Sequence, residues 1–188
     1  MSAKKTADLK TIINKYPQAR KMLLMPSFSS GRQLLHNLNQ EGIKIFNCDL
    51  ETPLGLLKKS LGLQLFKENL TIIENEQTSY LIYRVLVELK AAEKLKYFDQ
   101  LQLSDGSIKL LAGTILEYRL AGYSAQDIEA DKFIKAEKAK DLKLINQVYE
   151  EKLNNENYLD QAAAYELALT AYGSSNVREE CSYTKELV

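Results

Sequence analysis

The chain is poor in the residues from which compact metal and catalytic sites are usually built. Its 188 residues include one histidine, two cysteines and no tryptophan. Cys48 and Cys181 are far apart and have no metal-ligand spacing, which excludes a disulfide framework and a zinc ribbon and suits a reducing cytoplasm. A Ser-His-Asp or Cys-His arrangement would depend on His36 alone, and a lone histidine is usually not a ligand or catalyst.

Long apolar runs are also missing. The apolar runs that are present extend over only a few residues, as at Met22–Met25, whereas a transmembrane helix needs about 20 apolar residues. The first ten residues contain no apolar stretch that could serve as a signal peptide. The sequence therefore predicts a cytoplasmic chain with no membrane partner.

Charge of one sign is not in excess, but it is unevenly distributed. Lys plus Arg and Asp plus Glu number 25 each, while 45% of residues are hydrophobic, as in a globular protein. Residues 1–60 carry a net charge of +6 and the remainder carries −6. A basic first third fits a polyanion partner, although a lysine-rich, solvated terminus is the simpler interpretation.

The first third of the chain has an α/β pattern. A helix is expected over residues 6–15, followed by a strand at Lys21–Met25 and a turn-rich segment at Ser27–Gly31. A helix then ends at Gly42. Ile43–Leu50 alternates apolar and polar residues, which predicts a second strand. Thr52 and Pro53 then have the form of a helix start.

The rest of the chain is expected to be helical. Leucine, isoleucine and valine recur at helical spacing around residues 81–89, 108–116 and 142–153, and a last helix is expected over 158–171. Ser104 and Gly122 have the positions of an N-cap and a C-terminal stop. Residues 173–180 have no pattern and predict a loop.

Two strands are too few for an independent open sheet. Either residues 65–75 and the tail supply further strands, or the chain is part of a longer protein. The predicted fold class is thus α/β, with a short, incomplete parallel sheet and a predominantly helical remainder.

The turn after the first strand does not meet the requirements of a nucleotide-binding P-loop. Gly31 occupies the second glycine position, but Pro26, Arg32 and Gln33 stand where glycine, lysine and a hydroxyl residue are required. We therefore expect no nucleotide or other cofactor. Ser27, Ser29, Ser30 and Gly31 still lie between a strand and a helix N-terminus, where anions commonly bind, although a simple capped turn explains them as well.

Other candidate groups give weak signals. Asp49 and Glu51 flank the end of the second strand, a frequent site position in α/β proteins, but no third ligand accompanies them. Most tyrosines have the helical spacing of core residues. Phe28 is the exception, because it lies in the turn between Ser27 and Ser29 and could stack on a base.

The order of these segments resembles superfamily 1 helicases of the UvrD/RecB type. Met22–Leu35 is similar to the second strand and motif Ia of that family, and Phe46–Leu57 is similar to the strand and Thr-Phe-His-Ser-Leu-Ala segment that follow. Asn157–Ala168 resembles the helix before Walker B. The helical block, including Leu116–Ile128, is especially similar to the B subunit of AddAB-type ATP-dependent helicase–nucleases, PD-(D/E)XK nuclease family proteins with a degenerate N-terminal helicase-like region.

The resemblance covers about residues 20–172 and implies a P-loop-helicase-like α/β part (1–72), a helical insertion (73–153), and a return helix with a tail (154–188). It further implies a fragment of a longer DNA-repair and recombination protein. No Walker A, Walker B or nuclease motif is present, so we expect no catalytic activity and no catalytic residue, metal site or cofactor in this chain. In the parent protein, an ATP-dependent exodeoxyribonuclease subunit, the chemistry would belong elsewhere.

By position, the resemblance implies single-stranded DNA contacts from six residues: Ser27, Phe28, Ser29, Gly31, Arg32 and Thr52. It also implies a partner helicase–nuclease subunit. Two alternatives remain open. The helical block could dock that partner while the turn is only structural, or the chain could be a nucleotide-binding enzyme with an atypical phosphate loop, which the failed P-loop positions disfavour.

Overall fold

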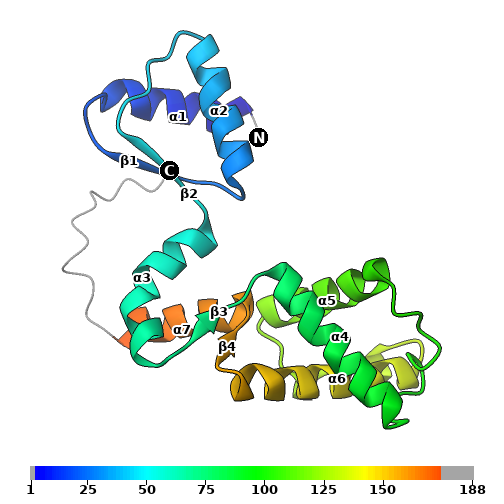
Figure 1. The fold of residues 1–188 in the computed structure, drawn as a ribbon. Coiled ribbons are helices and arrows are strands. Elements are labelled where there is room, and N and C mark those ends of the chain that lie inside the picture. The colour runs from blue at the N-terminus through cyan, green and yellow to red at the C-terminus, as the bar shows by residue number, and fades with distance from the viewer. Residues whose placement is uncertain (1–2, 175–188) are drawn as a thin grey trace. The chain divides into compact units, whose positions relative to one another are not determined.

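A computed structural model describes residues 3–174, and these residues form a mostly helical chain with two short parallel sheets. They divide into two compact units, residues 3–60 and 61–174. Figure 1 labels the elements, which follow in the order α1 (Ala3–Lys15), β1 (Lys21–Leu24), α2 (Phe28–Gln40), β2 (Cys48–Glu51), α3 (Pro53–Lys67), β3 (Thr71–Ile72), α4 (Asn75–Ala91), α5 (Asp105–Leu120), η1 (Ala125–Asp127), η2 (Ala130–Lys132), α6 (Ala136–Asn155), β4 (Tyr158–Leu159) and α7 (Gln161–Ser174).

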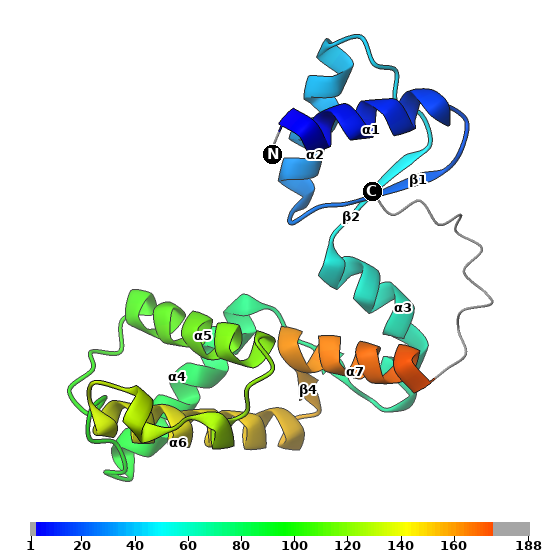
Figure 2. The same cartoon turned by 180° about the vertical axis from the view of Figure 1, so that it is seen from behind.

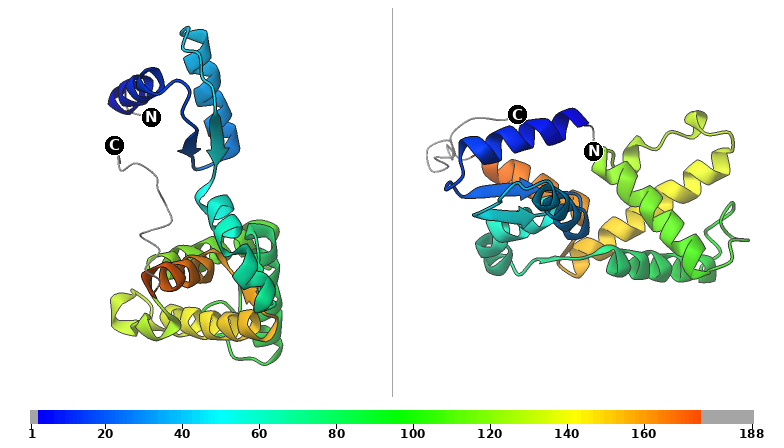
Figure 3. Two further views of the ribbon diagram at one scale, coloured as in Figure 1. Left: turned by 90° about the vertical axis from the view of Figure 1, so that its left-hand side faces the viewer. Right: turned by 90° about the horizontal axis from the view of Figure 1, so that it is seen from above.

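The first unit is built on a parallel pair of strands joined by α2. β1 and β2 lie side by side in Figure 3, in a register that pairs Lys21 with Cys48 and Leu24 with Glu51. β2 is shorter than the predicted strand over residues 43–50. Asn47 has a φ of 50°, in the left-handed region, so the extended backbone can begin only after it.

α2 covers the face of this pair that carries Leu50. A Cβ atom built on Gly31 would lie 2.9 Å from Leu50 Cδ2 and 3.2 Å from Met25 Cγ, so the helix approaches the strands closely at Gly31. The opposite face is open in the first unit. Met22 and Leu24 are 46% and 47% exposed there.

The first unit buries a small set of apolar side chains, one from each helix and one just after β1: Ile13, Leu38, Leu57 and Met25. Lys10 of α1 forms an ion pair with Glu41, just after α2. A small core of this kind leaves much apolar surface accessible, as expected for about 60 residues with two strands.

The second unit has a larger core between α4, α5 and α6, whose ribbons are seen from behind in Figure 2. The predicted helical stripes are confirmed. Leu81, Val85 and Leu89 of α4 are almost fully buried, as are Leu111 and Ile115 of α5, and Leu142, Ile145, Tyr149 and Leu153 of α6. Ser104 caps α5 by accepting a hydrogen bond from the Ser107 amide at 3.2 Å, and Gly122 follows it with a φ of 83°.

The structure corrects the expectation of one incomplete sheet. Within residues 3–174 there are two separate parallel pairs, because Thr71 and Ile72 pair with Tyr158 and Leu159 rather than with β1 or β2. The predicted last helix accordingly begins at Gln161, after this strand, instead of at residue 158. Two adjacent residues per strand leave too little periodicity for the pairing to be read from sequence.

The unit boundary lies at Ser60, within α3, whereas the predicted α/β part extended to residue 72. β3 belongs with the helical unit because its strand partner lies there. The expected loop at 173–180 lies almost wholly outside the described residues. Among residues 3–174, no helix is long and apolar enough to cross a membrane.

Candidate nucleic-acid interface

Parallel pairing of β1 and β2 brings two helix starts to the same edge of the first unit. The turn after β1 begins at Pro26, and Thr52 follows β2. The two chain segments are held together there by a hydrogen bond of 2.9 Å from the Met25 amide to the Glu51 carbonyl. Because the carboxyl ends of parallel strands meet at one edge, the turn that begins at Pro26 and the helix start at Thr52 lie at the same edge of the strand pair.

Ser27 is the N-cap of α2. Its hydroxyl oxygen accepts a hydrogen bond from the Ser30 amide at 3.2 Å and lies 3.0 Å from the Ser30 hydroxyl. The Ser30 hydroxyl donates to the Ser27 carbonyl at 2.9 Å. Both hydroxyl groups are therefore engaged in starting the helix, and the capped-turn interpretation of this segment is correct for them.

Three side chains of this turn remain available to a ligand. Phe28 is 47% exposed, and Ser29 and Arg32 are exposed. Within the part of the chain whose side chains are described, Arg32 has no hydrogen bond or ion pair. An exposed ring, a hydroxyl and a guanidinium are thus grouped in the first five residues of α2.

Gly31 has a packing role in this geometry. It is buried, its amide donates to the Ser27 carbonyl at 3.1 Å, and its lack of a side chain admits Leu50 and Met25. An amide already bonded within the first helical turn offers little to a phosphate.

Thr52 caps α3 through a hydrogen bond of 3.0 Å that its hydroxyl accepts from the Gly55 amide. The same helix start holds the Glu51 carboxylate, which accepts from the Thr52 amide at 3.1 Å and pairs with Lys59. The hydrogen bond from Lys59 and, to a smaller extent, that from the Thr52 amide hold the pKa of the Glu51 carboxyl below its ordinary 4.5. The Glu51 carboxylate therefore already occupies the N-terminus of α3, where an anionic ligand would otherwise be favoured.

Asp49 and Glu51 do not act as a pair. Asp49 accepts a hydrogen bond of 2.7 Å from Arg20 Nε at the surface, whereas Glu51 is buried against α3. The tight fit of the Glu51 carboxylate over Gly55 was not predicted. A partial signal for it existed in the sequence, since a carboxylate beside a helix N-terminus is stabilising.

The other candidate groups are not arranged for chemistry. His36 Nε2 lies 3.0 Å from Gln40 Nε2, one helical turn away. Burial raises the pKa of the Cys48 thiol, so the reactive thiolate is disfavoured. Among the described residues, no three His, Cys, Asp or Glu side chains are close enough to hold a metal ion. Cys181 lies outside the described residues.

The second unit contains a buried charge cluster that sequence reasoning missed. Arg119 of α5 donates to Asp160 at 2.7 Å and also pairs with Glu150 of α6. Asp160 is fully buried and accepts further hydrogen bonds from the Tyr149 hydroxyl at 3.3 Å and the Ala163 amide at 2.9 Å.

This cluster joins three helices rather than forming a reactive site. Asp160 is the residue before α7 and bonds its first turn, so one carboxylate links α5, α6 and α7. Burial, followed by the charge of Asp160, raises the pKa of the Tyr149 hydroxyl far above its usual range. A tyrosine held neutral and a fully paired arginine have no group free for proton transfer.

No family model matches the chain, and no curated protein resembles it closely enough to count as a match.

Proposed function

We propose that this chain is a non-catalytic, helicase-like module of a DNA-repair helicase–nuclease subunit, and that it contacts the backbone of single-stranded DNA. The observation that carries the proposal is the N-terminal part of α2, where Phe28, Ser29 and Arg32 are exposed together at the carboxyl edge of two parallel strands.

The chemistry of this turn suits a single strand. A guanidinium and a hydroxyl can bind phosphate oxygens, which position nucleic acid without reading its sequence. An exposed phenylalanine offers a face on which a base can stack, at about 1–3 kcal/mol per base. The net charge of +6 in residues 1–60 would attract the polyanion over a longer range.

The geometry reduces the six predicted contact residues to a smaller set. Ser27 and Thr52 cap helices, and Gly31 is buried, so each acts by shaping the turn. Phe28, Ser29 and Arg32 would make the contacts. The Glu51 carboxylate disfavours a phosphate at the start of α3, which directs the strand towards α2.

The test is binding of a labelled, mixed-sequence single-stranded oligonucleotide, followed by fluorescence anisotropy over a series of salt concentrations. We expect binding that weakens as salt rises, because each phosphate contact releases about one counterion. The double variant Phe28→Ala/Arg32→Ala should bind at least about tenfold more weakly, as expected for the loss of one stacking and one charge contact.

Lys44→Ala is the matched control. Lys44 is an exposed cation of the same unit and precedes β2, at the opposite end of the strands. The Lys44→Ala variant removes one positive charge, as Arg32→Ala does, without changing the turn before α2. Equal losses in both variants would indicate diffuse electrostatic attraction, and absence of binding at low salt would exclude this role for the chain.

A protein-docking role is the second candidate, favoured by the open face of the first unit. Met22 and Leu24 lie two residues apart on the same face of β1, and each is nearly half exposed. Such apolar surface commonly marks an interface. In this case a partner helicase–nuclease subunit would cover the face. Self-association that is abolished by Met22→Ser/Leu24→Ser, together with no DNA binding, would favour docking over DNA contact.

A further inference from the structure

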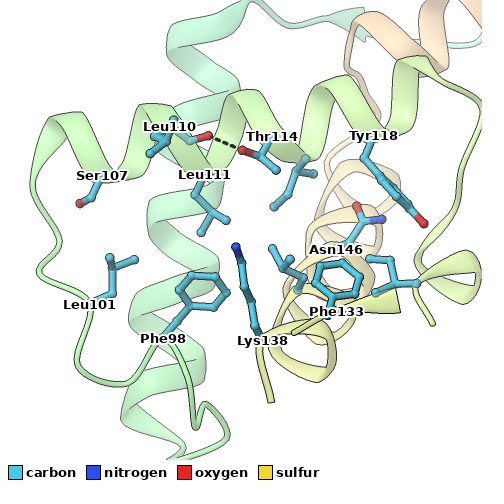
Figure 4. A pocket seen from close by; sticks show the side chains of 13 residues that line it. Phe98, Leu101, Ser107, Leu110, Leu111, Thr114, Tyr118, Phe133, Lys138 and Asn146 are labelled. Carbon is cyan, nitrogen blue, oxygen red and sulfur yellow. Dashed lines mark hydrogen bonds between the residues drawn. The ribbon is translucent and has the colours of Figure 1, made fainter. Parts of the chain in front are cut away.

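The second unit contains an apolar cavity lined by α5, α6, the segment that joins them and the segment before α5. Its volume is about 260 Å³. Figure 4 shows the side chains around it, which are mostly aromatic or aliphatic and include Phe98, Leu101, Leu111, Ile115, Phe133 and Leu142. A cavity of about 150 Å³ holds benzene, so this one has room for about ten non-hydrogen atoms.

One polar group in this wall has no partner. Asn146 of α6 is 1% exposed, and neither its Oδ1 nor its Nδ2 atom forms a hydrogen bond with any described residue. Figure 4 shows its amide at the cavity, which Tyr118 and Phe133 also line. A buried amide without partners destabilises a fold, so a group that bonds both atoms would be favoured there.

Two other polar side chains of the wall are satisfied by hydrogen bonds to the backbone. The Thr114 hydroxyl donates to the Leu110 carbonyl at 2.9 Å, and the Ser107 hydroxyl donates to the Gln102 carbonyl at 2.5 Å. Lys138 is half-buried, and its ammonium, which Figure 4 shows pointing into the cavity, lies 5.9 Å from the centre of the Tyr97 ring. Asn146 is therefore a fully buried side chain of this wall with unused hydrogen-bonding capacity.

We propose that this cavity is a binding site for a small, mostly apolar molecule that carries a lactam or carboxamide group. A side-chain amide offers one acceptor and donors side by side, and a lactam edge presents the complementary donor and acceptor. A carboxylate could bond Nδ2 and the Lys138 ammonium, but it would face Oδ1 with another acceptor. A pure hydrocarbon would fill the volume but leave both atoms unpaired.

The proposal can be tested with three probes of matched size: 2-quinolinone, naphthalene and 2-naphthoate. Two-dimensional ¹⁵N NMR of the whole chain detects the Asn146 side-chain amide directly. We expect 2-quinolinone to shift that resonance and to bind about tenfold or more tightly than naphthalene, since it alone pairs both amide atoms. Asn146→Leu should reduce this preference to about twofold or less.

Asn154→Leu is the matched control, because Asn154 lies on the same helix and is exposed. It should keep the wild-type preference. The thermal midpoint of Asn146→Leu should equal or exceed that of the wild type, which also shows that the variant is folded. Equal affinities for 2-quinolinone and naphthalene, tighter binding of 2-naphthoate, no binding of any probe, or an unshifted Asn146 resonance would each overturn the proposal.

Discussion

At the scale of single residues, the fully buried Asp160 has the largest predicted effect on stability. It accepts hydrogen bonds from Arg119, Tyr149 and Ala163, so Asp160→Ala would leave the largely buried guanidinium with Glu150 alone. We expect the free energy of unfolding to fall by about 3–5 kcal/mol, as for other broken buried pairs. Urea unfolding measured by circular dichroism would give this value.

Glu129→Ala provides the comparison for that loss. Glu129 pairs with Lys132 at 2.8 Å, and both side chains are exposed. Removal of such a surface pair should change the unfolding free energy by less than about 1 kcal/mol. Similar losses for Asp160→Ala and Glu129→Ala would mean that the buried cluster contributes no more than a surface contact.

Glu51 makes the stability of the first unit depend on pH in the acidic range. Its pKa in the folded chain is lower than the ordinary 4.5, so it stabilises the fold above that value, and this contribution is lost as pH falls through the lowered pKa. The unfolding free energy of the wild type should therefore decline from neutral pH to about pH 3. Glu51→Gln should be less stable at neutral pH and should show a flatter decline.

This dependence can be followed by hydrogen exchange of peptides from residues 9–60 at several pH values. The peptides of the second unit serve as the internal reference, because Glu51 belongs to the first. Parallel pH profiles for the wild type and Glu51→Gln in residues 9–60 would contradict a role of Glu51 in the acid response.

At the scale of secondary structure elements, α5 and its C-terminal end contain two glycines for which alanine should have opposite effects. Gly113 lies inside the helix, and a methyl group added to it would meet no atom within 4 Å, so Gly113→Ala should stabilise by about 0.5–1 kcal/mol. Gly122 follows the helix with a φ of 83°, so Gly122→Ala should destabilise by about 1 kcal/mol. Thermal unfolding of both variants checks the signs, and equal signs would contradict this account of the helix end.

At the scale of the whole molecule, each compact unit buries its own apolar side chains, and the larger core belongs to the second. Leu86 is fully buried among α4, α5 and α6. Leu86→Ala should lower the unfolding free energy of residues 61–174 by about 2–5 kcal/mol. Hydrogen exchange should quicken in α4, α5 and α6 but not in β1 or α2, whereas equal acceleration in both units would show one cooperative structure.

Charge is also separated at this scale, with a basic first third and an acidic remainder. This separation is consistent with the proposed DNA contact in the first unit, because a basic unit attracts a polyanion. The proposed ligand cavity lies in the second unit, so the DNA and ligand experiments test different parts of the chain.

Local sequence determined most helices of this protein and several of their ends. Ser104 and Gly122 mark α5, and Thr52 with Pro53 starts α3, because caps and stops act within one turn of the chain. The predominantly helical character and the strand–turn–helix arrangement around Phe28 and Arg32 followed from the same local rules. The helicase resemblance and its DNA contacts remain predictions.

Only the tertiary structure decided the remaining features, because they join residues distant in sequence. Pairing of Thr71–Ile72 with Tyr158–Leu159 spans the whole helical block and involves too few residues for a periodic signal. Three helices meet at Asp160, and packing of α5 and α6 leaves the Asn146 amide in an apolar wall. A residue's type shows which bonds it can form, but which partners it meets depends on how the helices pack.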